Sequence, residues 1–294
     1  MNHRSCSIVR RSLCLGAGMG WAGLVLGQAK PAGVGDCVQR VGLGSVGSLA
    51  FGGASPQGLL VDLFAMLSRP MGCRFEPDVL STALLRRAWQ GRRAGHGPHW
   101  IALLSQSTRT PRLLLMRSPM ALVQSANASP RNLHALLQDD SQSFIQMDGS
   151  LLGRPFDAWL KHLPPERKQK AADVDSLLRM MAAGRAQVAV LPLLAVESRQ
   201  RQLKLESHLR LQVLAGAPHR VGQPHFEATG IGFDPSLLPS DAPARMGEAL
   251  RAMRADGSLA TLLARYLDPR WIEDCLLSQA LTGSLEVPQA LSRG

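Results

Sequence analysis

A glycine motif near the start of the chain is the stretch whose residue types most resemble a site for chemistry. The spacing G-x-G-x-x-G runs from Gly42 to Gly47 and follows a short β-type run at 37–41. In dinucleotide-binding folds such glycines lead into a helix whose first N–H groups face the pyrophosphate. Here Pro56 opposes such a helix, and the better helical pattern, 59–67, starts only after it. Because Glu76 could mimic the ribose-binding acid, a nucleotide-dependent oxidoreductase remains an alternative hypothesis that rests on one motif.

Other side chains with catalytic or metal-binding chemistry do not form sets. Ser105 and Ser107 lack the G-x-S-x-G elbow of a hydrolase nucleophile. The histidines flank turns and loops without the spacing of metal ligands, and there is no C-x-x-C pair. The sequence therefore predicts no catalytic residues, no metal site and no cofactor.

The basic residues are spread along the chain, which has a formal net charge of +11 and a single tyrosine. Nucleic-acid binders usually collect their charge on one face and often add aromatic platforms. We therefore expect a solvated basic surface and no nucleic-acid partner, with the steering of anionic ligands as a weaker possibility.

The first 29 residues have the pattern of a cleaved export signal. Arg4, Arg10 and Arg11 come before an uncharged run at 12–27, and small residues precede a cleavage point after Ala29. A membrane anchor needs roughly 20 predominantly apolar residues, and this glycine-containing run is shorter. We predict a periplasmic protein exported by the general secretory or the twin-arginine route, and both routes stay open. Removal of the signal lowers the formal charge to 11 − 3 = +8.

Three cysteines remain after the signal. Cys37 and Cys73 each stand at the start of a strand-like run, and a helical pattern separates the two runs. If the runs are parallel neighbours of one βαβ unit, the two cysteines lie side by side within bridging distance. An oxidising compartment permits the bond, so we predict a Cys37–Cys73 disulfide, and the partner of Cys275 is left open.

The mature chain of 294 − 29 = 265 residues exceeds one ordinary domain and suits two lobes. Strand-like and helical stretches alternate, which is typical of an α/β class. Strand-like runs are expected at 38–43, 73–77, 99–104, 143–147, 188–191 and 227–233. Helices are expected at 59–69, 82–90, 131–138, 151–163, 175–183, 195–202, 243–255 and 258–267. The basic stretch at 164–170 reads as a connector, and the last 25 or so residues lack clear periodicity.

Several short motifs occur in an order that matches a known family. In chain order they are Gly58-Leu-Leu-Val-Asp62-Leu63 (G-x-x-x-D-L), Gly72, Gln90-Gly91-Arg92 (x-G-r), Met116-Arg-Ser-Pro119 (F-S-x-P), Phe144 to Ser150 (v-x-x-G-s), Leu178 with Gly184-Arg185 (L-x-x-G-r), Gly230 to Phe233 (G-i-a-f) and Met253 to Tyr266 (m-x-x-d-G-t-l, then Y-l). This order resembles the periplasmic solute-binding proteins of the type 2 fold, specifically the amino-acid-binding branch (family 3) of ABC transport.

The resemblance implies two α/β lobes, each a mixed sheet flanked by helices, joined by two crossing strands. Lobe one would comprise 38–120 plus 223–268, lobe two 121–222, and the C-terminal tail 269–294. It implies a small ligand in the cleft between the lobes. The carboxyl ends of strands in open α/β sheets are where ligands gather, so the residues themselves also favour a cleft.

The ligand-binding residues carried over from the resemblance come from three loops: Phe51; Ser107, Thr108, Arg109 and Arg112; and Asp148, Gly149 and Ser150. The family clamps a ligand carboxylate with the arginine of T-x-x-R, but neither arginine here reproduces the spacing, and which of them faces the cleft is open. A guanidinium suits a carboxylate or phosphate. The 148–150 turn precedes a helix and could hold an anion.

The family's ammonium-binding aspartate would fall near Pro192, where this chain has no acid. A cleft without that carboxylate has no obvious partner for an ammonium group. The sequence therefore predicts a monomeric exported protein that binds a small polar or anionic solute, not a standard free α-amino acid. It would serve a membrane permease or a sensor kinase. A dehydratase-like enzyme on the same fold is a further alternative hypothesis.

Overall fold

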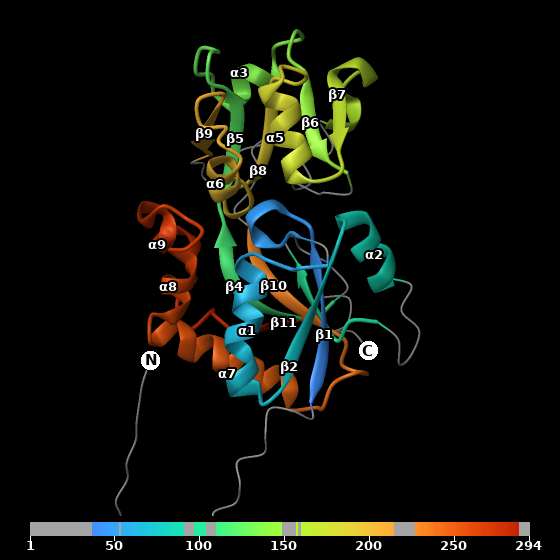
Figure 1. Cartoon of the computed structure of the whole chain (residues 1–294), viewed down its shortest axis with the longest axis vertical. Coiled ribbons are helices and arrows are strands. Elements are labelled where there is room, and N and C mark those ends of the chain that lie inside the picture. The colour runs from blue at the N-terminus through green and yellow to red at the C-terminus, as the bar shows by residue number, and fades with distance from the viewer. Residues whose placement is uncertain are drawn as a thin grey trace, which may run out of the picture. The chain divides into compact units, whose positions relative to one another are not determined.

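The computed structural model describes residues 37–52, 54–90, 97–103, 110–148, 157, 160–214 and 227–287. These residues form two sheets flanked by helices, and Figure 1 shows how the elements follow one another. The predicted α/β class with two mixed sheets is confirmed.

The first sheet has six strands in the order β11-β4-β10-β3-β1-β2. Strand β1 pairs in parallel with β2 and β3, whereas β10 runs antiparallel to β3 and β4, and β11 antiparallel to β4. The strands are β1 (Val38–Gly44), β2 (Arg74–Leu80), β3 (Trp100–Leu103), β4 (Arg112–Ser118), β10 (Glu227–Phe233) and β11 (Leu285–Glu286). The helical elements associated with this sheet are η1 (Gly47–Leu49), α1 (Leu59–Met71), α2 (Thr82–Gln90), α7 (Ala242–Ala255), α8 (Ser258–Leu263), η3 (Pro269–Trp271) and α9 (Ile272–Cys275).

Helix α1 forms because apolar residues recur along one of its faces. Leu59, Leu63 and Leu67 are spaced four residues apart and are fully buried, which is the stripe of a core-facing helix. The helix ends at Gly72, which adopts the left-handed conformation and donates its N–H to the carbonyl of Arg69. Helix α1 therefore fixes the connection between the parallel strands β1 and β2.

The second sheet has five strands in the order β7-β6-β8-β5-β9. Strand β6 is parallel to β7 and β8, and β5 is antiparallel to β8 and β9. The strands are β5 (Met120–Ser125), β6 (Phe144–Met147), β7 (Lys168–Ala171), β8 (Val188–Pro192) and β9 (Leu209–Val213), and the helical elements are α3 (Leu133–Leu137), η2 (Pro165–Arg167), α5 (Val174–Ala182) and α6 (Leu193–Gln202). The stretch 164–170, predicted as a connector, instead forms η2 and the edge strand β7, with Lys168 and Lys170 exposed.

The chain passes from the first sheet to the second through one residue. Strand β4 ends at Ser118 and β5 begins at Met120, so that only Pro119 lies between them. Its carbonyl accepts a 2.7 Å hydrogen bond from the N–H of Leu193, at the start of α6. The return connection, 215–226, lies outside the described residues. The first crossing is thus held directly against α6.

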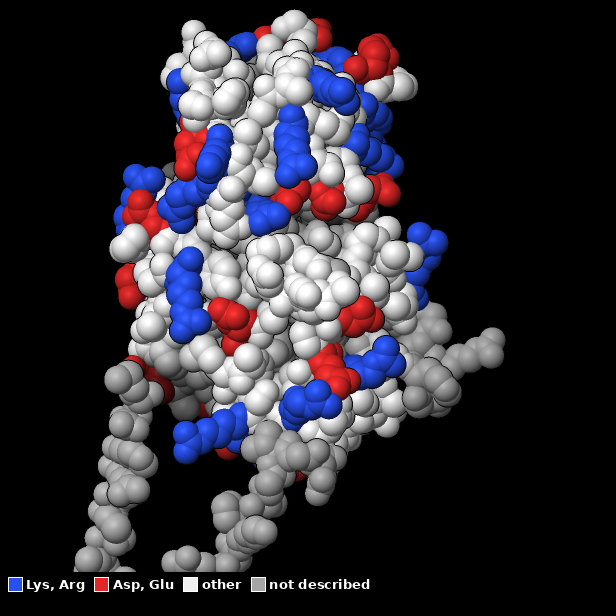
Figure 2. Space-filling view, viewed as in Figure 1, with Lys and Arg blue, Asp and Glu red and all other residues white. Residues whose placement is uncertain are grey.

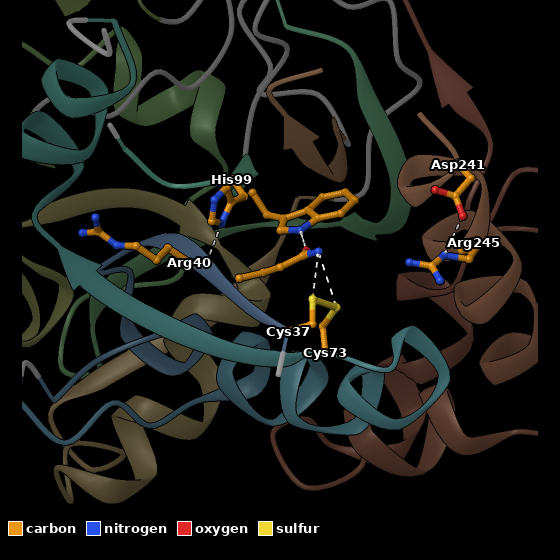
Figure 3. The surroundings of a disulfide bond; sticks show 8 residues. Cys37, Arg40, Cys73, His99, Asp241 and Arg245 are labelled. Carbon is orange, nitrogen blue, oxygen red and sulfur yellow. Dashed lines mark hydrogen bonds and ion pairs between the residues drawn. A yellow bond between two sulfur atoms is a disulfide. The ribbon is translucent and has the colours of Figure 1, made fainter. Parts of the chain in front are cut away.

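The predicted disulfide joins Cys37 and Cys73 at the starts of β1 and β2, with 4.6 Å between their Cα atoms (Figure 3). The parallel register pairs Val38 with Arg74, which sets the two cysteines side by side. The buried side chain of Gln39, in β1, lies next to the disulfide. Its amide nitrogen approaches the two sulfurs at 3.8 and 3.6 Å, and its side-chain oxygen accepts from the indole N–H of Trp100. A buried polar network therefore connects the disulfide to β3.

The C-terminal segment after α8 packs against the first sheet and adds a strand to it. Cys275 and Thr282 are fully buried, and Cys275 is a free thiol whose burial raises its pKa to about 12. Strand β11 then pairs with β4. Sequence periodicity gave no sign of this docking, because these contacts come from turns and short elements.

Candidate functional site

The candidate site is the set of loops that follow the parallel strands, because ligands of open α/β folds gather at those ends. In the first sheet the described residues of this kind are 45–51, after β1, and Ser81, after β2. In the second sheet they are Asp148 after β6, Asp173 after β7 and Pro192, the last residue of β8.

The glycine motif is explained by packing within the protein. Gly42 lies in β1, where a Cβ atom would come within 2.7 Å of a methyl group of Leu85 in α2. Gly47 has φ +53°, and a Cβ atom there would lie 2.0 Å from the carbonyl oxygen of Ala195 in α6. The element at Gly47 is only the short turn η1, and the next helix, α1, begins at Leu59. The helix N-terminus that a dinucleotide fingerprint needs is thus not formed at the third glycine.

Phe51 follows η1 and starts a small hairpin. Its backbone N–H and carbonyl exchange two 2.9 Å hydrogen bonds with Gln57. The guanidinium of Arg199, from α6, lies 4.2 Å from the centre of the ring, in cation–π geometry. The sequence analysis expects the Phe51 ring to contact a ligand, but the guanidinium of Arg199 covers one face of that ring.

Arg199 itself is tightly held. Its guanidinium forms two hydrogen bonds with the carboxylate of Asp175, the residue two positions after the N-cap of α5, one of them at 2.6 Å. This bond to Asp175 raises the pKa of Arg199. Such a fork-to-carboxylate pair fixes the plane of the guanidinium, and that plane lies over Phe51. Sequence reasoning missed this residue, because Arg199 and Arg201 both stand in the last turn of α6 and nothing local distinguishes them.

Arg112 is buried at the start of β4, with its side chain only 4 % exposed. Its Nε donates a 2.7 Å hydrogen bond to the carboxylate of Glu286 in β11. In the sheet it lies opposite Gly232, six residues before the end of β4 at Ser118. In this conformation the carboxylate that meets Arg112 comes from the C-terminal segment.

Asp148 directly follows strand β6 of the second sheet. Its N–H already donates to the carbonyl of Ala171 at 2.8 Å, and its carboxylate pairs with the exposed Lys170 at 3.2 Å. The N–H of this residue is thus engaged in extending the sheet. Gly149 and Ser150, which follow it, lie outside the described residues.

The loop after β3 is described only at its end. Ser107, Thr108 and Arg109 lie outside the described residues, and the next residue, Thr110, is buried. Its hydroxyl accepts a 3.0 Å hydrogen bond from the indole of Trp89 in α2. This bond anchors the far end of the loop that carries three of the predicted site residues.

Two serines that the sequence analysis did not single out meet beside Phe51. The hydroxyl of Ser198 in α6 donates to that of Ser48 in η1 at 2.6 Å, and both residues are buried. Their separation of 150 residues left no sequence signal for the contact. Both the serine pair and the Phe51–Arg199 pair bring the loop after β1 onto the helix after β8.

Lys and Arg are interspersed with Asp and Glu on the face that Figure 2 shows. Within the described part of the chain no group of three His, Cys, Asp or Glu side chains is placed to hold a metal ion. None of the helices described has the length and apolar character of a membrane span.

The protein consists of two mixed sheets with flanking helices, and the β4–β5 crossing connects the two sheets. This arrangement defines its class: it has the two-lobe fold of the type 2 periplasmic binding proteins. We use lobe one for the body of the six-stranded sheet and lobe two for that of the five-stranded sheet. No protein-family model and no curated protein sequence matches the chain.

Solved structures with this fold include sensor domains and transport proteins. The BvgS VFT2 domain of Bordetella pertussis, in a double mutant, is 16% identical with a TM-score of 0.58, over 78% of this chain and 93% of that one. A histidine kinase sensor domain with similarity to periplasmic binding proteins is 16% identical with a TM-score of 0.59, over 78% and 96%. An arginine transport system periplasmic binding protein from Legionella pneumophila is 14% identical with a TM-score of 0.57, over 79% and 100%. At these identities the likeness establishes the fold.

Proposed function

We propose that the protein is an exported solute-binding protein that captures a small polar or anionic solute between its lobes. The observation that carries the proposal is the β4–β5 crossing between two mixed sheets, whose strand ends supply loops from both lobes. Solved structures with the same fold bind solutes for transport or serve as sensor domains. The captured solute would be presented to a membrane permease or to a sensor kinase.

A solute other than a standard free α-amino acid is favoured by the start of α6. The resemblance implies that the ammonium-binding aspartate of the amino-acid-binding branch would fall near Pro192. The residues just after it are buried against η1. An ammonium group placed there would lose its water without gaining a carboxylate partner.

The solute-binding residues that we propose are the loop 107–109, with Arg109 as the anion clamp, and the turn Gly149-Ser150. Arg109 is preferred over Arg112, because Glu286 already pairs with Arg112. Phe51 would contact the solute with the part of its ring that Arg199 does not cover. A guanidinium offers two parallel N–H donors, which suits a carboxylate or phosphate group.

Thermal unfolding against a metabolite panel tests this function. We expect a carboxylate or phosphate solute to raise the melting temperature, and the standard amino acids to leave it unchanged. A ligand at 100 times its Kd adds about 2.7 kcal/mol to the free energy of unfolding. Calorimetry on Arg109→Met should then show weaker binding, whereas the exposed Arg179→Met in α5 should bind as the natural protein does.

Three results would contradict the proposal in different ways. Stabilisation by no solute on the panel would remove the binding function. Turnover of prephenate or arogenate would favour the dehydratase-like enzyme. Binding of a nicotinamide or flavin dinucleotide, with the fluorescence of the cofactor, would favour the oxidoreductase.

A further inference from the structure

Helix α6 belongs to lobe two but is buried on almost every side. Of its ten residues, 193–198 and Gln200 are buried, although a surface helix normally keeps one polar face in water. The side that does not pack on its own sheet meets two segments of lobe one. These are η1 with Phe51, and the residues just after α8.

The backbones of η1 and α6 approach each other closely in this contact. Gly47 sits so near the carbonyl of Ala195 that a Cβ atom would be 2.0 Å from its oxygen. Its φ of +53° also favours glycine. The hydroxyl of Ser48 donates to that same carbonyl at 3.4 Å. This position thus combines a backbone conformation and a contact that only a residue without a side chain permits.

Side chains on both sides of this approach complete the contact. The Ser48 and Ser198 hydroxyls pair at 2.6 Å, and Arg199 lies over the ring of Phe51. On the other flank, the N–H of Asp268 donates a 3.1 Å hydrogen bond to the carboxylate of Glu197. We call this set of contacts between η1, Phe51, Asp268 and α6 the junction.

The junction is also continuous with the hydrophobic core. Leu49 and Ala50 of lobe one belong to the same buried cluster as Leu193 and Leu194 of lobe two, and each is at most 1% exposed. Separating the lobes here would expose these side chains to water, which opposes opening. It would also leave the serine pair without its internal hydrogen bond. Each of the groups named finds its partner within the chain.

We propose that the junction holds the two lobes together without a solute, so that solute binding does not bring them into contact. The lobes are already in contact at η1 and α6 in the empty protein. A solute therefore enters a site between two lobes that the junction already connects. A partner that distinguishes the loaded from the empty protein then reads a local change rather than a large hinge rotation. This conformational inference concerns the empty protein and is independent of which solute binds.

The test compares two glycines that share a left-handed conformation. Gly47→Ala places a methyl group against Ala195. Gly72→Ala is the matched control, because Gly72 has φ +65° and a Cβ atom there would meet nothing within 4 Å. Backbone strain is therefore similar in both variants, whereas only Gly47→Ala forces η1 away from α6.

Distances between the lobes are measured with spin labels on cysteines at two exposed positions, Gln138 in lobe two and Glu248 in lobe one. The native pair Cys37–Cys73 is oxidised and Cys275 is buried, so neither takes the label; Cys6 and Cys14 are replaced by serine. The protein is unfolded, dialysed and refolded beforehand to remove any solute that purified with it.

We expect one narrow distance distribution in the solute-free protein and in Gly72→Ala, and a longer, broader one in Gly47→Ala. Hydrogen exchange of residues 193–202 should be slow in the first two and at least tenfold faster in the third. Ser198→Ala removes the hydrogen bond to Ser48 without adding atoms, and it should accelerate the same exchange to a smaller extent. This second variant replaces Gly47→Ala in the test if Gly47→Ala does not fold.

The proposal is overturned if the solute-free natural protein already gives the broad distribution. It is equally overturned if a folded Gly47→Ala, or Ser198→Ala where Gly47→Ala does not fold, leaves the exchange of 193–202 unchanged. Because no solute is added, these outcomes are separate from those of the metabolite panel. A protein that binds no panel solute can still have the junction, and a solute-binding protein can lack it.

Discussion

Tyr266 is the only tyrosine of the chain, and its hydroxyl group joins the turn after α8 to helix α1. It donates a 3.0 Å hydrogen bond to the carboxylate of Asp62 in α1, which Arg265 also contacts at 3.3 Å. Burial, followed by the bond to Asp62, raises the pKa of Tyr266 to about 12. The neutral phenol is therefore the form that the fold favours. Stability from this group is fully present below the unfolded pKa of about 10 and is lost as the pH rises above it.

A spectrophotometric titration at the tyrosinate band reads this group without interference from a second tyrosine. We expect no ionisation near pH 10 in the folded protein, and ionisation only close to pH 12, with circular dichroism recorded at each point. Asp62→Asn should lower the pKa of Tyr266, since it removes a negative charge beside the phenol. Asp140→Asn, in lobe two, should leave it unchanged. Tyrosinate formation near pH 10 in the natural protein would contradict the bond.

Thr229 and Thr282 are both fully buried, but only one of them has a partner for its hydroxyl. In the described residues the hydroxyl of Thr229, in β10, makes no hydrogen bond, whereas that of Thr282 donates to the carbonyl of Ser278 at 3.1 Å. An unsatisfied buried hydroxyl costs about 1–3 kcal/mol, and a satisfied one contributes about 1 kcal/mol.

Replacement by valine keeps the shape of each side chain and removes the hydroxyl. Thr229→Val should raise the free energy of unfolding by about 1 kcal/mol, and Thr282→Val should lower it by a similar amount. Urea denaturation of both variants measures the difference. Loss of stability in Thr229→Val would mean that its hydroxyl has a partner, such as a buried water.

At the scale of elements, the disulfide fixes the starts of β1 and β2, the outer pair of the first sheet. It closes a loop with a sequence separation of 36. Closure of a loop of that length is worth about 4 kcal/mol in the chain-entropy model. Because Gln39 and Trp100 are hydrogen-bonded in series behind the sulfurs, the cross-link also supports β3.

Reduction should therefore destabilise the protein strongly. We expect a reductant to lower the free energy of unfolding by about 4 kcal/mol, measured by urea denaturation with and without the reagent. The double variant Cys37→Ala with Cys73→Ala should start from the lower stability and show no response to the reductant. A natural protein that is equally stable when reduced would contradict this role of the bond.

One edge strand of each sheet, β2 and β7, is protected by its residue types. Strand β2 contains Pro77 and an ion pair between Arg74 and Glu76, and β7 presents two lysines. Proline and lysine on edge strands discourage pairing with other chains. The free edges of β2 and β7 are thus poor templates for strand addition.

At the scale of the whole molecule, the fold depends on contacts between distant parts of the chain. The C-terminal segment covers β4 and pairs Glu286 with the buried Arg112, and α6 carries the junction. The side chain of Arg112 is 4% exposed and that of Glu286 is 45% exposed, so the pair reaches from the interior of lobe one to its surface. Arg112 thus has a structural role that its sequence position next to Arg109 did not reveal.

Local patterns in the sequence predicted most of the regular elements. The leucine stripe of α1, the apolar run of β8 and the cysteines before β1 and β2 are short-range signals, and the structure confirms the elements and the disulfide that they predict. The patterns did not reveal β4, β5, β7, β9 or β11. Strand β7 is an edge strand whose exposed lysines follow no apolar alternation, and β9 gains its pairing from β5, far away in the chain.

The sequence by itself determined the α/β class, the alternation of elements and the cysteine pair, because periodicity and adjacent parallel strands are properties of neighbouring residues. Only the tertiary structure decided what the glycine loop and the candidate arginines contact. Gly47 meets Ala195, Phe51 meets Arg199 and Arg112 meets Glu286. The two partners of each pair are 148 or more residues apart in the printed chain (195 − 47 = 148, 199 − 51 = 148, 286 − 112 = 174). Such pairings arise from the folding of whole sheets, so no local pattern of residues could specify them.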